Sequence, residues 1–339
     1  MPNALLDVSF PSASKGFALS ADRLLSTSDG GRSWRVLRAA AGARWTSIDF
    51  VNASDGWLLG AGGLLSTTDG GAHWRRLAGP CEEMRSVDFV SAEEGFAIAG
   101  GGEAAPLGAL WGRGETSVLH SSNGGRTWSR LPAPGHAQSL CFLNDEVGFL
   151  GADGNVYATE DGGERWTLSL EGQSGRSARP LAVVGCARGG AWAEIVGPGG
   201  EASQEPHIAY AYEHGSWQPV FAEQYFPHPS VDVTRGSPGS EPASFSAISA
   251  EAAVFIDFCP ACSPPSAPIA IAGDGGRTLA RLGNIPSMSE VTSASFRSER
   301  EGWVAGALFE GGGHVEFLLL HTDDRGRTWQ TQYTVGQQH

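Results

Sequence analysis

The sequence has very little lysine and few charged residues of any kind. Lys15 is its only lysine, set against 22 arginines, and charged residues make up 18% of the 339 positions. Acidic residues outnumber basic ones by 37 to 23, for a formal net charge of −14. Binding to nucleic-acid phosphates or anionic lipid depends on summed positive charge, so neither partner is expected. The sparse charge also argues against coiled coils and charged disordered tails.

Long hydrophobic runs are missing as well. The longest stretches resemble 317–320 and 268–272, whereas crossing a bilayer takes about 20 apolar residues, so no membrane insertion is expected. The first residues show no basic and apolar leader, which leaves two interpretations open. Either the protein is cytoplasmic, or it is exported and its signal is not part of this sequence.

Glycine, in contrast, is abundant at 48 residues, and a repeated phrase accounts for much of it. Segments 26–34 and 66–74 align without a gap and end in Trp34 and Trp74. Further copies end at Trp128, Trp166 and Trp329, and weaker ones occupy 272–279 and 212–217. A second phrase, an apolar strand followed by a Gly-aromatic pair as in 48–57, precedes each copy. The chain therefore contains seven similar units.

Each unit has the pattern of four strands joined by short turns, which is typical of a propeller blade. Seven units in 339 residues give about 48 residues each, a usual blade length. We therefore predict an all-β fold, a single seven-bladed β-propeller of four-stranded antiparallel blades spanning 1–339. A β-helix solenoid is the alternative, disfavoured because its turns lack paired hairpins. The expected blades cover approximately 5–38, 45–78, 85–132, 138–170, 180–221, 244–282 and 291–334.

The repeated turn has a mechanical explanation. An Asp or Asn at its head accepts hydrogen bonds from backbone N–H groups further along, and the glycines allow positive φ. The phrase Ser/Thr-x-Asp-x-Gly-x-Thr-Trp resembles the Asp-box, or BNR, repeat of sialidases, other glycoside hydrolases, sortilin-type receptors and photosystem II assembly factors. That resemblance implies a structural hairpin away from the ligand face. The residues to which it assigns this structural role are Asp29, Asp69, Asn123, Asp161, Asp274 and Asp324.

Loop lengths point to one face of the ring as the binding surface. The connection between second and third strands is short in three units and expanded in the other four, at 100–117, 196–207, 258–268 and 306–316. A long segment, 218–243, also joins the fifth and sixth units. In four-stranded antiparallel blades all these connections emerge at the same end of the propeller, and binding residues concentrate on variable loops.

Residues at the starts of the innermost strands should ring the mouth of that face. We place Arg44, Arg85, Arg179 and Glu290 there, and three arginines could bind a carboxylate or phosphate. Pairing of these arginines with local acids such as Glu82 is the alternative reading. Two aromatic residues of the insertions, Trp111 and Tyr225, are further candidates for contacting a ligand or for burial under their own loops.

The five cysteines do not indicate a metal site. Cys259 and Cys262 lie in a loop, where we expect a local disulfide if the protein is exported and free thiols if it is not. Cys141 and Cys186 occupy first-strand positions, where small apolar filling is expected. The spacing of His207 from the other histidines does not match a metal-ligand pattern. We therefore expect no metal and no cofactor.

Two functional hypotheses follow. The first is a non-catalytic binding or assembly-scaffold propeller that recognises a protein or glycan through the face with the long loops. The second, left open, is a glycoside hydrolase of the sialidase or Asp-box endoglucanase type, which needs two carboxylates facing each other across a cleft. The Phe-Arg-Ile-Pro segment usual in sialidases is missing, which favours the first hypothesis. We expect a bacterial, monomeric, extracytoplasmic protein, with a cytoplasmic location as the alternative.

Overall fold

The computed structural model describes residues 4–39, 43–79, 84–100, 115–172, 180–197, 205–223, 235–260, 262, 266–309 and 314–337. Within these residues the chain forms seven four-stranded sheets and no helix. Each sheet contains four consecutive strands in chain order, all antiparallel. The strands of blades 1 to 4 are β1 (Leu5–Ser9), β2 (Gly16–Ser20), β3 (Arg23–Thr27), β4 (Arg35–Ala39), β5 (Trp45–Phe50), β6 (Gly56–Gly60), β7 (Gly63–Thr67), β8 (Arg75–Arg76), β9 (Met84–Phe89), β10 (Gly95–Gly100), β11 (Thr116–Ser121), β12 (Ser129–Leu131), β13 (Ala137–Phe142), β14 (Gly148–Ala152), β15 (Asn155–Thr159) and β16 (Thr167–Leu170). Those of blades 5 to 7 are β17 (Leu181–Ala187), β18 (Gly190–Val196), β19 (His207–Glu213), β20 (Ser216–Ala222), β21 (Glu241–Ala247), β22 (Ala253–Phe258), β23 (Ala267–Gly273), β24 (Thr278–Ile285), β25 (Glu290–Phe296), β26 (Gly302–Phe309), β27 (Val315–Thr322) and β28 (Gln330–Gln337).

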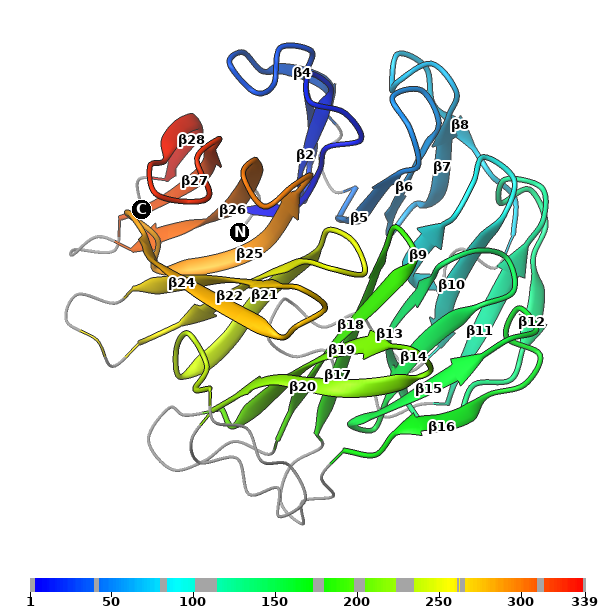
Figure 1. The fold of residues 1–339 in the computed structure, drawn as a ribbon. Helices are drawn as coiled ribbons and strands as arrows, with labels where there is room; N and C mark the ends of the chain where they lie inside the picture. Colours follow the sequence, from blue (N-terminus) through cyan, green and yellow to red (C-terminus); the bar gives the residue numbers. More distant parts are fainter. Residues whose placement is uncertain are drawn as a thin grey trace.

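The sheets stand around a common centre, and the first strand of each blade is innermost (Figure 1). Strands β1, β5, β9, β13, β17, β21 and β25 contact one another in that order, and β25 contacts β1 again. The last strands, such as β8, β12 and β16, lie on the outside. The fold is thus the predicted all-β, seven-bladed propeller of four-stranded blades, and the solenoid alternative is excluded.

Within the described residues, the two ends of the chain do not share a sheet where the ring closes. Blade 1 contains only strands β1 to β4, and blade 7 only β25 to β28. Side chains of β25 make the junction instead: Thr292 Oγ1 donates to the Leu5 carbonyl at 2.7 Å, and Ser293 Oγ donates to Asp7 Oδ1 at 3.0 Å. Ser293 Oγ also accepts from the Val8 amide at 3.3 Å.

In five of the blades a glycine precedes the second-strand aromatic residue, and this glycine has a steric role. A Cβ atom on Gly56, Gly95 or Gly148 would lie 2.3–2.5 Å from the ring of the phenylalanine paired with it on the first strand. The same holds for Gly16 and Gly302, at 2.2 Å. No real Cβ tolerates such a distance, so the Gly-aromatic phrase exists to let a phenylalanine ring lie flat against the neighbouring strand.

Those phenylalanine rings join successive blades. Phe50 stacks on Phe17 of the preceding blade with centroids 3.7 Å apart, and Phe89 stacks on Trp57 at 3.5 Å. The pattern continues in Phe96 with Phe142, and Phe10 stacks on Trp303 across the ring closure. Trp74, Trp128 and Trp166, at the ends of the repeated turns, meet the same rings edge-on. Aromatic contacts between blades therefore form much of the core.

The Asp-Gly-Gly turns are held by their own side chains. Thr27 Oγ1 accepts from the Gly31 amide at 2.8 Å, while the Asp29 carboxylate accepts from the Ser33 amide at 2.9 Å and the Ser33 hydroxyl at 2.6 Å. The two bonds from Ser33 are the main reason that the pKa of Asp29 falls to about 2. The Gly30 amide donates to the Ser14 carbonyl, which lies in the turn between the first and second strands. Both kinds of turn thus occupy one face of the ring, and the connections between second and third strands emerge at the other.

Innermost strands are also linked by polar groups. The Asp49 carboxylate accepts from the Phe89 amide of the next blade at 2.7 Å, and Asp88 accepts from Phe142 at 2.9 Å. In blade 4 the equivalent residue is Cys141, which forms a disulfide with Cys186 of blade 5. This corrects the expectation that these two cysteines only fill apolar space.

Candidate functional site

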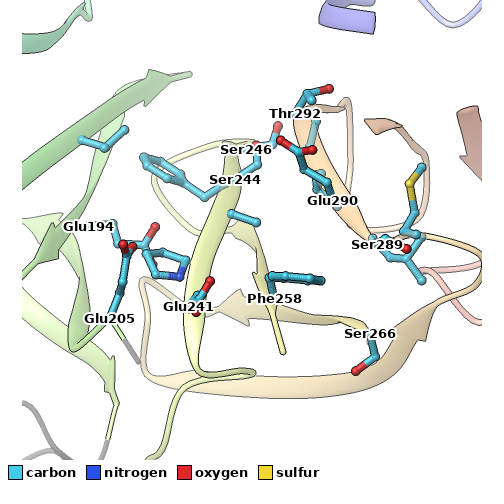
Figure 2. Close-up of a pocket in the computed structure, with 18 of the residues that line it drawn as sticks. Glu194, Glu205, Glu241, Ser244, Ser246, Phe258, Ser266, Ser289, Glu290 and Thr292 are labelled. Atoms are coloured by element: carbon cyan, nitrogen blue, oxygen red, sulfur yellow. The ribbon is translucent and has the colours of Figure 1, made fainter. Parts of the chain in front are cut away.

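A cavity of about 1450 Å³ opens among blades 5, 6 and 7. Its walls come from the innermost strands β17, β21 and β25, from the end of β18, and from residues 284–289 that lead into β25 (Figure 2). Phe258, Pro260 and Ser266 of the blade 6 connection border it, as do Leu308 and Phe309 at the end of β26. The cavity therefore extends from the centre of the ring to the face that carries the longer connections.

Its position follows from small residues at two places on the innermost strands. In blades 2, 3, 4 and 7 the residue paired with the second-strand glycine is phenylalanine. In blade 5 the residue before the second-strand aromatic is Ala191, which pairs with Cys186, and in blade 6 it is Val254, which pairs with Ser246. Cys186 and Ser246 both line the cavity. Where the stacked ring is missing, the blades no longer fill the space between them.

The described lining is acidic. Four glutamates contribute to it, namely Glu194, Glu205, Glu241 and Glu290, and no described lysine or arginine does. Figure 2 shows them arranged along the walls, with Glu194, Glu205 and Glu241 near one another. Burial, and then the charge of Glu205, raises the pKa of Glu241. Serine hydroxyls at 244, 246, 266 and 289 and apolar surface from Phe245, Met288 and Leu308 complete the walls.

Behind the wall lies a buried polar group that the sequence did not indicate. Glu194 of β18, His207 of β19 and Asp257 of β22 converge, each less than 5% exposed. Burial raises the pKa of the Glu194 carboxyl. Histidine spacing alone was uninformative, because the partners come from another strand and another blade. The available signal was Glu194 itself, a carboxylate in the otherwise apolar segment Ala-Trp-Ala-Glu-Ile-Val.

The residues expected at the mouth are only partly brought together. Glu290 begins β25 and lines the cavity. Arg44 is exposed immediately before β5, and Arg85 lies partly buried in β9, where burial lowers its pKa. Neither arginine contributes to the described lining. Arg179, Trp111 and Tyr225 lie outside the described residues, so their roles stay predictions.

Carboxylates also line the centre of the ring on the side of blades 1 to 3. Burial raises the pKa of Asp7, Asp49 and Asp88, and the charge of Asp88 raises that of Asp49 further. Each of them accepts a backbone N–H from a neighbouring blade, as in the bond from the Ile48 amide to Asp7. Their role in the described structure is to connect blades.

Seven four-stranded blades with a repeated hydrogen-bonded turn define a propeller of the BNR type. The chain belongs to a particular family of that type. The family model described as photosynthesis system II assembly factor YCF48 matches residues 1–80 and 43–188, more than half of the sequence.

Solved structures agree with this assignment at the level of the fold. A YCF48 structure bound to a D1 peptide is 21% identical, with a TM-score of 0.51, and covers 86% of this chain and 81% of its own. YCF48 from Cyanidioschyzon merolae is 19% identical, with a TM-score of 0.53 and coverage of 85% and 84%. A GH74 enzyme from Niastella koreensis is 11% identical, with a TM-score of 0.58, and the match covers 97% of this chain and 66% of the enzyme. Comparison with curated protein sequences gave no match.

No helix in the described parts of the chain is long and apolar enough to cross a membrane.

Proposed function

We propose that this protein is a non-catalytic propeller that binds an extended, positively charged segment of a partner protein in the cavity among blades 5 to 7. The observation that carries the proposal is the acidic lining, to which four glutamates and no described lysine or arginine contribute. Membership of the YCF48 family supports a protein partner, since one YCF48 structure holds a D1 peptide.

The dimensions and composition of the cavity fit a polypeptide. At about 1450 Å³ it exceeds the roughly 300–1,000 Å³ that small-molecule pockets occupy. Serine hydroxyls and apolar patches alternate along its walls, which suits a peptide with both polar and apolar side chains. Glu241 and Glu290 begin β21 and β25 and are accessible, so they are placed to meet lysine or arginine side chains.

The test is selection of binding peptides from a random displayed library, followed by affinity measurement on the selected peptides. We expect enrichment of lysine and arginine, and binding that weakens as salt rises, because exposed charge pairs are screened within about 10 Å at 0.1 M salt. The double variant Glu241→Gln, Glu290→Gln should bind about tenfold more weakly, since exposed charge pairs contribute up to about 1 kcal/mol each.

Glu251→Gln is the matched control. Glu251 is exposed in a turn on the opposite face, where its carbonyl accepts from the Gly275 amide, so the substitution changes the same charge away from the cavity. It should leave peptide affinity unchanged. Selected peptides without cationic enrichment, or equal affinities for the double variant and the wild type, would refute the proposal.

Glycoside hydrolysis is the second candidate, and the carboxyl groups of the cavity are the observation in its favour. A panel of chromogenic glycosides separates the two. Hydrolysis that is lost in Glu241→Gln or Glu290→Gln would establish catalysis there, whereas a panel left intact at high protein concentration would leave binding. The same panel with substitutions at Arg44, Arg85 and Tyr225 tests a sialidase-like arrangement. Direct titration with the same sugars measures glycan binding without hydrolysis.

We also propose an extracytoplasmic location. Two disulfides, Cys141 with Cys186 and Cys259 with Cys262, support it, because disulfides persist in oxidising compartments. Alkylation of protein taken directly from its host tests this. Blocked cysteines at these four positions are expected, and four reactive thiols would favour the cytoplasm.

A further inference from the structure

Three ionisable side chains meet in the interior between blades 5 and 6. Glu194 lies on β18, His207 on the neighbouring strand β19, and Asp257 on β22 of the next blade. Their exposed fractions are 4%, 0% and 1%. One ligand atom from each, an imidazole nitrogen and two carboxylate oxygens, lies within 4.8 Å of the other two. Burying such groups together is costly unless something compensates their charge.

A hydrogen bond to a backbone carbonyl sets the orientation of the His207 imidazole. His207 Nδ1 lies 2.8 Å from the Glu205 carbonyl oxygen, and because a carbonyl only accepts, Nδ1 carries a proton. Nε2 then faces Asp257, with 3.2 Å between Nε2 and Oδ2. A histidine that binds a metal almost always donates its other ring N–H to a carbonyl or carboxylate in this way.

Two carboxylate oxygens of the group lack a hydrogen-bond partner. Glu194 Oε1 and Asp257 Oδ1 are both buried, and neither has a donor among the described residues. Asp257 Oδ2 is satisfied, because it accepts from the Gly239 amide at 2.7 Å as well as facing His207. A buried oxygen without a donor costs free energy, so the free oxygens indicate a missing cation.

We propose that Glu194, His207 and Asp257 bind one divalent ion of the Zn²⁺ class. One nitrogen and two oxygens suit Zn²⁺ and similar transition ions, whereas Ca²⁺ and Mg²⁺ prefer oxygen ligands alone. Nε2 and Oδ2 are 3.2 Å apart, slightly less than the roughly 3.3–3.6 Å between two ligands that each lie about 2.0–2.2 Å from a tetrahedral ion. Any proton on Nε2 leaves as the ion binds.

Glu194 also lines the cavity, so the ion reaches the site from there and keeps a fourth position open towards it. The ion adds positive charge beside Glu194 but does not involve Glu241 or Glu290, the two glutamates that the peptide test substitutes. The competing arrangement is an imidazolium paired with the two carboxylates. Burial lowers the pKa of His207, but the hydrogen bond and charge of Asp257 outweigh it and raise the pKa above its ordinary value.

The experiment is calorimetric titration of the chelator-treated protein with Zn²⁺, and with Mg²⁺ in parallel. We expect one Zn²⁺ per chain and at least a hundredfold preference over Mg²⁺. Asp257→Asn and Glu194→Gln keep the shape of each side chain and remove its charge. Each should weaken Zn²⁺ binding by about a hundredfold, since even supporting residues of metal sites cost about 10–100-fold. Glu251→Gln on the opposite face and the exposed His214→Gln are matched controls and should bind as the wild type does.

Measurements on the wild type keep the test decisive if a variant does not fold. The thermal midpoint should rise with Zn²⁺ concentration, because an ion that binds only the folded state stabilises it. Anomalous scattering at the zinc edge should give a peak among the three side chains. No binding up to about 1 mM Zn²⁺, unchanged affinity in both folded variants, or a peak elsewhere would overturn the proposal and leave the peptide hypothesis untouched.

Discussion

Cys141 and Cys186 join the innermost strands of blades 4 and 5, with Cα atoms 5.5 Å apart. Cys141 pairs with Phe149 in the same register in which Asp49 pairs with Trp57 and Asp88 with Phe96. At the two earlier positions a carboxylate accepts an amide hydrogen from the next blade. At the third position, the disulfide between Cys141 and Cys186 makes the connection. Cys186 also lines the cavity.

Removing this disulfide should lower stability markedly. It closes a loop of 45 residues, for which the chain-entropy relation gives about 4 kcal/mol. We expect the free energy of unfolding of Cys141→Ser, Cys186→Ser to fall by that order in denaturant titrations. The control is Cys259→Ser, Cys262→Ser, whose bond spans three residues and for which about 2 kcal/mol is expected from the same relation. Equal losses for the two pairs would contradict this account.

A methyl group on Gly95 should destabilise blade 3. Its Cβ would lie 2.3 Å from the Phe89 ring, which stacks on Trp57 and cannot withdraw without breaking that contact. Overpacking of this kind costs about 1–3 kcal/mol. The matched control is Gly62→Ala, where the nearest atom is the end of the Arg76 side chain at 4.0 Å. Thermal and chemical unfolding of both variants checks the difference, and similar midpoints would refute the steric explanation.

The stacked phenylalanine rings between blades also show how much of the structure could be predicted from the sequence. Seven similar units, five of them with a Gly-aromatic pair, specify the blades, because the repeated aromatic residues pack one blade onto the next. The cavity follows from two departures from that pattern, Cys186 and Ser246, and comparing the copies at this position was enough to see them. The Glu194 group was beyond such reasoning, since only the packing of β18, β19 and β22 brings its members together.

Stability should fall as pH rises from about 4 to about 8, and Asp49 should be a main cause. Burial and the charge of Asp88 raise the pKa of Asp49 to about 8, above the value of 3.8 that it has in the unfolded chain. The folded state therefore holds a proton that the unfolded state loses, so its stabilising contribution is complete below about pH 4 and is lost as pH rises through 8.

Asp49→Asn isolates this contribution. The amide oxygen can still accept from the Phe89 amide, but no charge develops. Stability near pH 5 should change little. At pH 8.5 the free energy of unfolding of the variant should exceed that of the wild type by about 1–2 kcal/mol, less than the full shift implies because the Asp49 side chain keeps some exposure to solvent. Urea titrations across this range provide the measurement. Asp55→Asn, in an exposed turn, is the control for a change of net charge, and parallel pH profiles for wild type and Asp49→Asn would show the idea to be wrong.

Ring closure gives the last prediction, because blades 1 and 7 share no sheet. Ser293 Oγ donates to Asp7 and accepts from the Val8 amide, so Ser293→Ala removes a link that holds β1 to β25. We expect a loss of about 1–2 kcal/mol, as for other buried hydrogen bonds, together with faster hydrogen exchange at the amides of β1. Ser289→Ala is the matched control, because Ser289 Oγ accepts a hydrogen bond from the Phe309 amide within blade 7 itself. That control should leave exchange in β1 unchanged. Equal exchange in both variants would mean that packing of Phe10 on Trp303, and not this polar contact, closes the ring.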